Sequence, residues 1–197
     1  MVTDDTQTSR GRLLTAGKEL FSRLGYESTS TATIAREAGT SESQLVRYFG
    51  GKSGLLDAIF NESWRGLNDV ISQTIAESQH GREAILGVFS LMIQAFAQDP
   101  EIASIFMFEG RRVRGNEVAL SKGFQQFLDL VCRLIQRGQS DGSFRADVND
   151  AVLASAMMGA AEGMMRDRLI ARRVGKEEPF DSESLKKVFE AMVNGLA

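Results

Sequence analysis

The sequence predicts an all-α fold, in which a short N-terminal group of three helices precedes a longer helical region. Apolar residues recur at spacings of three and four along most of the chain, which is the period of helices with one buried face. The two prolines, Pro100 and Pro179, both fall in breaks between these periodic segments, where a residue that interrupts helices is tolerated. No alternating apolar and polar segment is long enough to indicate a strand.

The first three predicted helices are short and closely spaced. The first begins at Ser9 and ends at Gly25, a residue that suits a left-handed cap. The second begins within the serine and threonine run 28–31 and ends at Gly39, and the third begins after Ser41. The apolar residues that define the inner faces of the first and third helices are Leu13, Leu14, Gly17, Leu20, Phe21, Leu24, Leu45 and Phe49.

Longer helices are predicted for the rest of the chain. A fourth helix begins near Lys52, after Gly50-Gly51 ends the third, and runs past Trp64. Breaks between the later helices are expected at Gly81, Asp99-Pro100, Gly110–Gly115, Gly138–Gly142 and Gly175–Pro179. Within the third of these breaks, we interpret Arg111–Arg114 as a solvated loop rather than as a basic patch that binds nucleic acid.

The composition excludes several classes of protein. Of the 197 residues, 43% are hydrophobic and 25% are charged, which is typical of a globular chain and not of a disordered one. The longest uncharged stretch, residues 85–98, is too short to span a bilayer. No secretion signal is recognisable at the N-terminus, so a cytoplasmic location without membrane contact is expected. The formal net charge of -3 argues against indiscriminate coating of nucleic acid, but it leaves room for a local binding surface.

Residues that carry catalytic or metal chemistry are sparse. Cys132 is the only cysteine and lies in an apolar run, where we expect a buried side chain and no disulfide. His80 is the only histidine and has no partner at metal-ligand spacing. The chain also has no nucleophile elbow, phosphate loop or cofactor motif. We therefore expect no enzymatic activity, no metal and no cofactor.

Residues 31–45 have the spacing that a helix-turn-helix requires. Ala35 is small where the second helix crosses above it, and Gly39 can adopt the positive backbone angle of the turn. Ile34, Ala38 and Leu45 would then wedge the two helices at a fixed angle. This arrangement allows the second helix to enter a DNA major groove.

The flanks of this motif resemble the N-terminal domain of the TetR family of regulators over residues 10–60. The resemblance is carried by Leu13-Leu14 with Ala16, Leu20-Phe21, Gly25-Tyr26, residues 33–39, Leu45, Tyr48-Phe49, Lys52 and Leu55-Leu56. The sequence departs from the family pattern at Glu42, Ser43, Val46, Arg47 and Gly50-Gly51, where Lys, Gly, Tyr, His and Pro-Ser are common. Beyond residue 60 the likeness is only to a general plan of helices. The operator sequence is therefore left open.

The resemblance implies a helix-turn-helix DNA-binding domain at residues 1–52 and a ligand-binding and dimerisation domain at residues 53–197. It implies a transcriptional regulator, and we expect a repressor that a hydrophobic or amphipathic small molecule releases from a palindromic double-stranded operator. Two alternatives stay open, a TetR-like activator and a helical protein-interaction module that does not bind DNA.

Residues around the helix-turn-helix are the expected DNA contacts. Gln44 suits adenine and Arg47 suits guanine, whereas Glu42 is expected to accept from a cytosine amino group or to pair with a neighbouring arginine. Tyr48 and Lys52 match family positions that contact phosphates, and Arg10 is expected to reach a phosphate or the minor groove. The full set is Arg10, Thr29, Ser30, Thr31, Thr40, Ser41, Ser43, Gln44, Arg47, Tyr48 and Lys52. The alternative interpretation of each residue is a capped, solvated helix surface.

The late helices are expected to form a homodimer interface, as the resemblance implies. Small residues gather between positions 147 and 173, namely Ala151, Ala154, Ser155, Ala156, Gly159, Ala160, Ala161 and Gly163. The last helix carries a stripe of Leu185, Val188, Phe189, Met192 and Leu196. The alternative is that these stripes form core inside one chain.

The middle helices are expected to hold the effector, because the family places a cavity there and methionine suits an adaptable wall. The residues chosen as ligand contacts are Trp64, Met92, Phe96, Phe106, Phe127, Met157 and Glu162. Glu109, Arg112 and Arg166 are further candidates for polar anchors. Plain core packing is the alternative for each apolar member. A bound effector would shift the angle of the fourth helix and so separate the recognition helices of a dimer.

Overall fold

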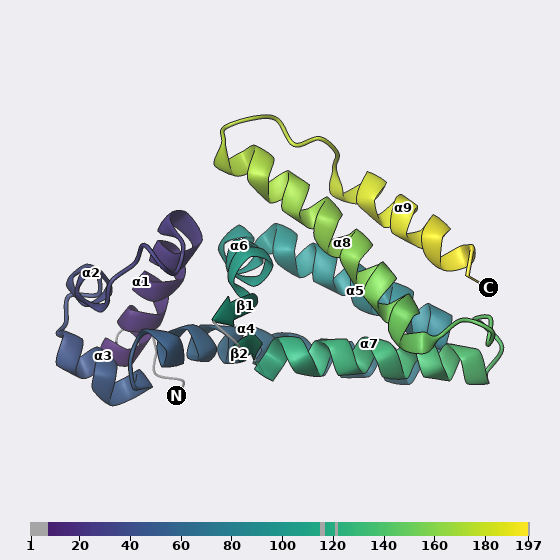
Figure 1. Ribbon diagram of the computed structural model, residues 1–197, viewed down its shortest axis with the longest axis horizontal. Coiled ribbons are helices and arrows are strands. Elements are labelled where there is room, and N and C mark those ends of the chain that lie inside the picture. Colours follow the sequence, from purple (N-terminus) through teal and green to yellow (C-terminus); the bar gives the residue numbers. More distant parts are fainter. Residues whose placement is uncertain (1–7, 115–116, 121, 197) are drawn as a thin grey trace. The chain divides into compact units, whose positions relative to one another are not determined.

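The computed structural model describes residues 8–114, 117–120 and 122–196, without the side chains of residues 111–124. The elements in chain order (Figure 1) are α1 (Ser9–Leu24), α2 (Thr31–Glu37), α3 (Glu42–Phe49), α4 (Lys52–Glu77), α5 (Gly81–Gln98), α6 (Pro100–Glu109), β1 (Arg111–Arg114), β2 (Glu117–Leu120), α7 (Lys122–Ser140), α8 (Asp150–Arg173) and α9 (Ser182–Asn194). The predicted all-α class is confirmed, with one small hairpin added. No helix in the described ranges is long and apolar enough to cross a membrane.

The hairpin corrects the interpretation of Arg111–Arg114 as a loop. These residues form β1, which pairs antiparallel with β2 so that Arg111 lies opposite Leu120 and Arg114 opposite Glu117. Each strand has only four residues. A segment of this length shows too few alternations for its period to be recognised in the sequence.

Two glycines at the predicted helix breaks also allow close packing. Gly138 lies inside α7, where an added Cβ would come within 2.3 Å of the Phe144 ring. Gly81 is the first residue of α5, where an added Cβ would come within 2.3 Å of the Gly138 nitrogen. The glycines therefore let the start of α5 approach the end of α7, and α7 ends later than predicted, at Ser140.

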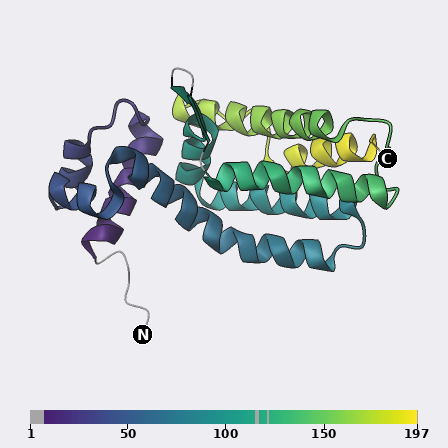
Figure 2. The same ribbon diagram turned by 60° about the horizontal axis from the view of Figure 1, so that its bottom comes forward.

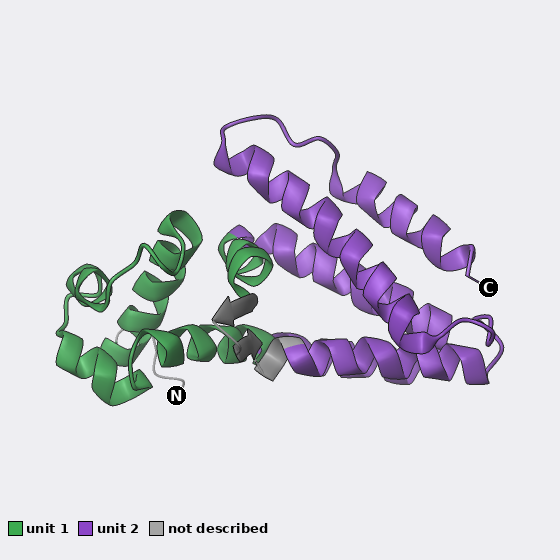
Figure 3. Ribbon diagram, viewed as in Figure 1, with its two compact units in different colours: residues 1–65, 101–123 green, residues 66–100, 124–197 purple. Residues whose placement is uncertain are grey.

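The chain divides into two compact units that do not follow the order of the sequence (Figure 3). Residues 1–65 and 101–123 form the first unit, and residues 66–100 and 124–197 form the second. Helix α4 contributes to both units, and α6 belongs to the first. The expected division into a DNA-binding domain and a ligand-binding domain after residue 52 stays a prediction.

The core of the first unit forms where α1, α2 and α3 meet. Leu13, Ile34 and Leu45 are each 0% exposed there, which accounts for the apolar spacing of the three helices. Gly17 lets α4 approach α1, because an added Cβ would lie 2.8 Å from the Leu55 side chain. The Arg12 guanidinium donates to the Ala38 carbonyl at 2.9 Å and so ties α1 to the helix-turn-helix turn.

Helix α6 is attached to this core by polar and aromatic contacts. The Glu109 carboxylate accepts a hydrogen bond from the Tyr26 backbone N–H at 2.9 Å. The Phe106 ring contacts Trp64 at a centroid distance of 5.4 Å and Phe60 at 6.0 Å. These contacts place a helix from the middle of the sequence beside the loop between α1 and α2.

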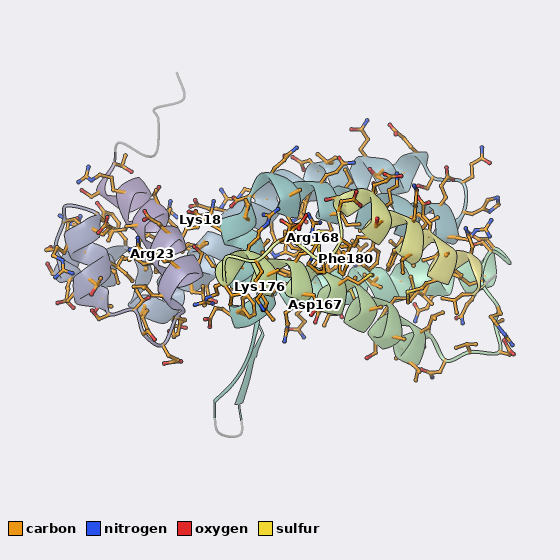
Figure 4. All side chains as sticks on the ribbon, turned by 90° about the horizontal axis from the view of Figure 1, so that it is seen from above. Lys18, Arg23, Asp167, Arg168, Lys176 and Phe180 are labelled. Atoms are coloured by element: carbon orange, nitrogen blue, oxygen red, sulfur yellow. The ribbon has the colours of Figure 1, made fainter. Side chains whose placement is uncertain are left out.

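The second unit is a helical bundle in which α5, α7, α8 and α9 come together (Figure 2). Phe89 of α5 contacts Phe189 of α9 at 4.0 Å and Phe127 of α7 at 6.4 Å between ring centroids. Arg168 of α8, labelled in Figure 4, is 7% exposed. It donates to Glu178 at 2.5 Å and to Ser182 at 2.9 Å. The link from α8 to α9 is therefore held by a partly buried, charge-assisted network.

Asp141 secures the loop that follows α7. Its carboxylate accepts from the Gly81 N–H at 2.7 Å and from the Ser143 N–H at 3.0 Å. Desolvation raises the pKa of Asp141, but the hydrogen bonds from Ser143 and Gly81 outweigh it and hold the pKa below its ordinary value. The loop thereby caps the N-terminus of α5, for which His80 provides no side-chain hydrogen bond.

Candidate nucleic-acid interface

The helix-turn-helix predicted from residues 31–45 is present. Ser30 caps α2 by accepting from the Thr33 N–H at 3.1 Å, and Ser41 caps α3 by accepting from the Gln44 N–H at 3.4 Å. Gly39 adopts a φ of +59°, as the turn requires. The Thr40 N–H donates to the Ala35 carbonyl at 2.9 Å and closes the turn.

The outer side of α3 carries a linked polar cluster made of Gln44, Arg47 and Tyr48. The Arg47 guanidinium donates to the Gln44 side-chain oxygen at 3.1 Å and contacts the Tyr48 hydroxyl at 3.0 Å. The same guanidinium lies 4.9 Å from the centre of the Tyr48 ring, within the range of a cation–π contact. The residues expected to read bases are therefore held together on one side of the helix.

Ser41 and Ser43 extend this surface to the start of α3. Their hydroxyl oxygens are 2.9 Å apart, and both residues are exposed. Because the Ser41 hydroxyl already accepts from the Gln44 N–H, its proton can be donated to a ligand or to Ser43. Thr40 is half-buried in the turn beside them.

Glu42 makes a contact that the sequence did not predict. Its carboxylate accepts a hydrogen bond from the Thr31 hydroxyl at 2.6 Å and so connects the first turns of α2 and α3. The expected pairing of Glu42 with a neighbouring arginine is therefore corrected, because the Arg47 guanidinium donates to Gln44 and Tyr48 instead. Thr31 uses its hydroxyl proton in this contact.

The expected DNA contact of Thr29 is also corrected. Its side chain is 1% exposed, and its hydroxyl donates to the Gly25 carbonyl at 2.7 Å. Its backbone N–H donates to the Tyr26 carbonyl at 3.2 Å. Thr29 thus secures the loop between α1 and α2 and offers no group to a phosphate. Ser30 and Thr33 share a contact of 2.9 Å at the exposed start of α2.

Lys52 and Arg10 both have partners within the first unit. The Lys52 ammonium donates to the Tyr26 carbonyl at 2.8 Å and to the Thr29 carbonyl at 2.9 Å, and it lies 4.2 Å from the centre of the Tyr26 ring. Arg10 forms an ion pair of 2.8 Å with Glu62 of α4 and lies 5.5 Å from the Phe49 ring. A phosphate contact by either residue would therefore be added to these contacts or compete with them.

Sequence reasoning missed three residues that position this surface. Arg12 ties α1 to the helix-turn-helix turn, Glu62 holds Arg10, and Glu109 accepts from the Tyr26 N–H. Glu109 was expected to be a polar anchor for a ligand. No local signal could have identified its actual partner, which lies 83 residues earlier in the chain.

The expected effector residues are divided between the two units. Trp64 and Phe106 are buried in the first unit, where their rings are in contact. Met92, Phe96, Phe127 and Met157 are each at most 8% exposed in the second unit, and Glu162 is half-buried. Arg166 is exposed, and the side chain of Arg112 lies outside the described residues. Among the described side chains, no cluster of three metal-ligating groups is found.

The small-residue and apolar stripes of α8 and α9 each divide into a buried and an exposed face. Leu185 and Phe189 of α9 are 2% exposed and form core inside the chain, whereas Val188 is 50% and Met192 37% exposed. On α8 the exposed positions include Val152, Ala156, Gly159, Gly163 and Ile170, whose spacings of three, four and seven place them on one face. The expected α9 stripe is therefore only partly available to a partner. Cys132 is half-buried and not fully buried as expected.

A family model connects the geometry of the first unit with known proteins. The model described as "Bacterial regulatory proteins, tetR family" matches residues 13–59. This range begins within α1, ends within α4, and contains the whole helix-turn-helix.

Relatives of similar length match most of the chain. The HTH-type transcriptional regulator UidR of Escherichia coli K12 is 24% identical over 192 residues, which cover 98% of this chain and 94% of UidR. The HTH-type transcriptional repressor KstR2 of Rhodococcus jostii RHA1 is 26% identical over 151 residues, or 74% of each chain. The crystal structure of the transcriptional regulator FadR from Bacillus subtilis, in complex with stearoyl-CoA, matches with a TM-score of 0.78 at 16% identity, covering 94% of this chain and 98% of FadR.

Proposed function

This chain belongs to the TetR family of bacterial regulatory proteins, and from that premise we propose that it is a dimeric repressor, released from a palindromic operator by a small hydrophobic or amphipathic effector. As a member of the family it is a DNA-binding transcriptional regulator. The proposal concerns its oligomeric state, the sign of regulation, the residues that read DNA and the effector class.

The observation that carries the proposal is the surface of α3. Leu45 alone among the residues of this helix is buried, so most of the helix is left to face a ligand. The linked cluster of Gln44, Arg47 and Tyr48 supplies an amide, a guanidinium and a phenol hydroxyl on one side of the helix. Guanidinium and amide groups are the side chains best suited to guanine and adenine edges in the major groove. Ser30, Ser41, Ser43 and Lys52 complete the proposed interface as phosphate contacts.

The exposed face of α8 supports the proposed homodimer. An added Cβ at Gly159 or Gly163 would meet no heavy atom within 4 Å, so packing inside the chain does not require glycine at either position. Glycine within a helix costs about 1 kcal/mol relative to alanine. A second copy of the chain that approaches α8 closely would give these glycines a role. Two copies would also present two recognition helices to the half-sites of a palindrome.

The effector class is proposed from the relatives and from the core of the second unit. The Bacillus subtilis neighbour was crystallised with stearoyl-CoA, which combines a long apolar chain with an anionic head group. Met92, Phe96, Phe127 and Met157 supply buried apolar side chains from α5, α7 and α8. Unbranched methionines adapt to an inserted chain more readily than stiff side chains do. Such an effector lowers operator affinity only to the extent that it binds the state that cannot bind DNA more tightly than the state that can.

Selection from a random DNA library with the purified protein tests DNA readout. We expect an enriched palindrome, and Arg47→Ala should cost about 1–3 kcal/mol on that site and relax preference at one base pair. Arg133→Ala removes an exposed arginine from α7 and serves as the matched control, with unchanged affinity. A library without any enriched sequence would favour the protein-interaction module, and unchanged binding by Arg47→Ala would remove that residue from the interface.

Two further measurements test the sign of regulation and the effector. Stearoyl-CoA titrated into the complex of protein and selected operator should release the DNA, whereas a bound effector with no effect on operator affinity would refute induction by this compound. Transcription in vitro from a promoter that overlaps the operator should fall when protein is added. A rise would identify an activator.

A further inference from the structure

Val46 is exposed on α3 although its side chain is apolar. It is 54% exposed, more than any other large hydrophobic side chain described in the first unit. The core contact of α3 is made by Leu45, which is 0% exposed. Packing inside the unit therefore does not explain a valine at this position, where a β-branched residue is also a weak helix former.

The charged side chains nearest to Val46 on α3 form hydrogen bonds with other residues. Glu42 lies one helical turn earlier, and its carboxylate is held by the Thr31 hydroxyl at the start of α2. Arg47 is the next residue along, but its guanidinium is bound to Gln44 and Tyr48 on the other side of the helix. The isopropyl group of Val46 is thus left as an uncovered apolar spot between two fixed polar groups.

The chemistry of this spot restricts what it can recognise on DNA. Valine has no hydrogen-bond donor or acceptor in its side chain, so it cannot read the polar pattern of a base edge. The thymine 5-methyl group is the one apolar feature that a base edge presents in the major groove. The stiff χ1 angle of valine means that little side-chain freedom is lost when the methyl group is contacted.

We propose that Val46 determines operator specificity by packing against the 5-methyl group of a thymine in each half-site. This inference rests on the proposed function, because it requires α3 to lie in a major groove. It adds an apolar contact to the polar readout by Gln44 and Arg47. Each operator half-site then contains at least one thymine whose methyl group contributes to affinity through Val46.

The test removes the methyl group from the DNA and the isopropyl group from the protein. Each thymine of the selected operator is replaced in turn by deoxyuridine, which lacks only the 5-methyl group, and binding of wild-type protein and Val46→Ala is measured by fluorescence anisotropy. At one position per half-site we expect wild-type affinity to fall about fourfold, the ratio that corresponds to one buried methyl group. Val46→Ala should bind the thymine and deoxyuridine operators equally well at that position.

Two controls keep the result interpretable. Val70→Ala truncates a valine on α4 that is 45% exposed, and it should retain the wild-type response to deoxyuridine. If Val46→Ala does not fold, the deoxyuridine series on wild-type protein decides alone, and the absence of any sensitive thymine overturns the proposal. Equal sensitivity of wild-type protein and Val46→Ala at every thymine overturns it as well. Failure of the proposed function is a different outcome, because no operator would then be enriched in the library.

Discussion

Some side chains that were expected to contact DNA also hold the first unit together, and Lys52 shows this most clearly. The sequence indicated a phosphate contact, yet the ammonium group donates to two backbone carbonyls of the loop between α1 and α2. An ammonium group has three donors, so one remains for a phosphate. Lys52 thereby fixes the start of α4 against the loop between α1 and α2.

Replacement of Lys52 by methionine separates these two roles. Lys52→Met keeps an unbranched apolar stem but leaves the Tyr26 and Thr29 carbonyls without this donor, so the free energy of unfolding should fall by about 1–3 kcal/mol. Lys187→Met is the matched control, because Lys187 pairs at 3.6 Å with Glu183 on the surface of α9, where the two side chains are 70% and 65% exposed, and such a pair contributes about 0–1 kcal/mol. Urea unfolding without DNA measures both. Equal stability of the two variants would mean that Lys52 has no structural role.

The sequence predicted which residues cap helices better than it predicted which side chains bond to each other. Ser41 and Gly39 could be placed because caps and turns are local and depend on residue type. The hydrogen bond between Glu42 and Thr31 and the burial of Thr29 depend on the crossing of helices, which periodicity does not specify. Candidate readout residues were therefore found, and their partners were not.

At the scale of elements, the junction between α3 and α4 is set by two glycines in unusual conformations. Gly50 has a φ of +73° and Gly51 a φ of +129°, and an added Cβ at either would meet no heavy atom within 4 Å. The constraint is thus the backbone angle and not the available space. The junction determines how the recognition helix is joined to α4, which contributes to both compact units.

Alanine at Gly51 should therefore destabilise the protein even though the side chain has room. A non-glycine residue at this φ costs about 1–3 kcal/mol, and the melting temperature of Gly51→Ala should fall accordingly. Gly66→Ala provides the control within α4, because Gly66 is helical and equally open. There the substitution should raise stability by about 1 kcal/mol. Two variants that melt together would show that the junction adopts another backbone conformation in solution.

The apolar stripe on α9 shows what the spacing of apolar residues cannot predict. The stripe on α9 was correctly recognised as apolar, but its assignment to a partner surface needed the position of Phe89, which fills the inner side of Phe189. Core and interface stripes have the same spacing, so sequence alone cannot distinguish them. Exposure of Val188 and Met192 beside buried Leu185 resolves the stripe into its two faces.

At the scale of the whole molecule, the proposed function requires two copies of the chain, and the exposed face of α8 is the surface that would bring them together. Val152, Ala156 and Ile170 provide apolar area on this face, and the two open glycines keep its middle flat. Contact over this face would bury side chains that one chain alone leaves in water. Dimerisation and cooperative binding to a palindrome then depend on the same few positions.

A leucine at Gly159 should separate dimerisation from folding. The new side chain meets no atom of its own chain within 4 Å of the Cβ, so the helix should keep its stability or gain about 1 kcal/mol. In a dimer the same side chain would occupy the space of the approaching partner helix, and sedimentation equilibrium should show a shift from dimer to monomer. Gly66→Leu introduces the same side chain at an open helical position on α4 and should leave the dimer intact. Operator affinity should fall only in Gly159→Leu, because two half-sites can no longer be bound together. A Gly159→Leu protein that stays fully dimeric would place the interface elsewhere.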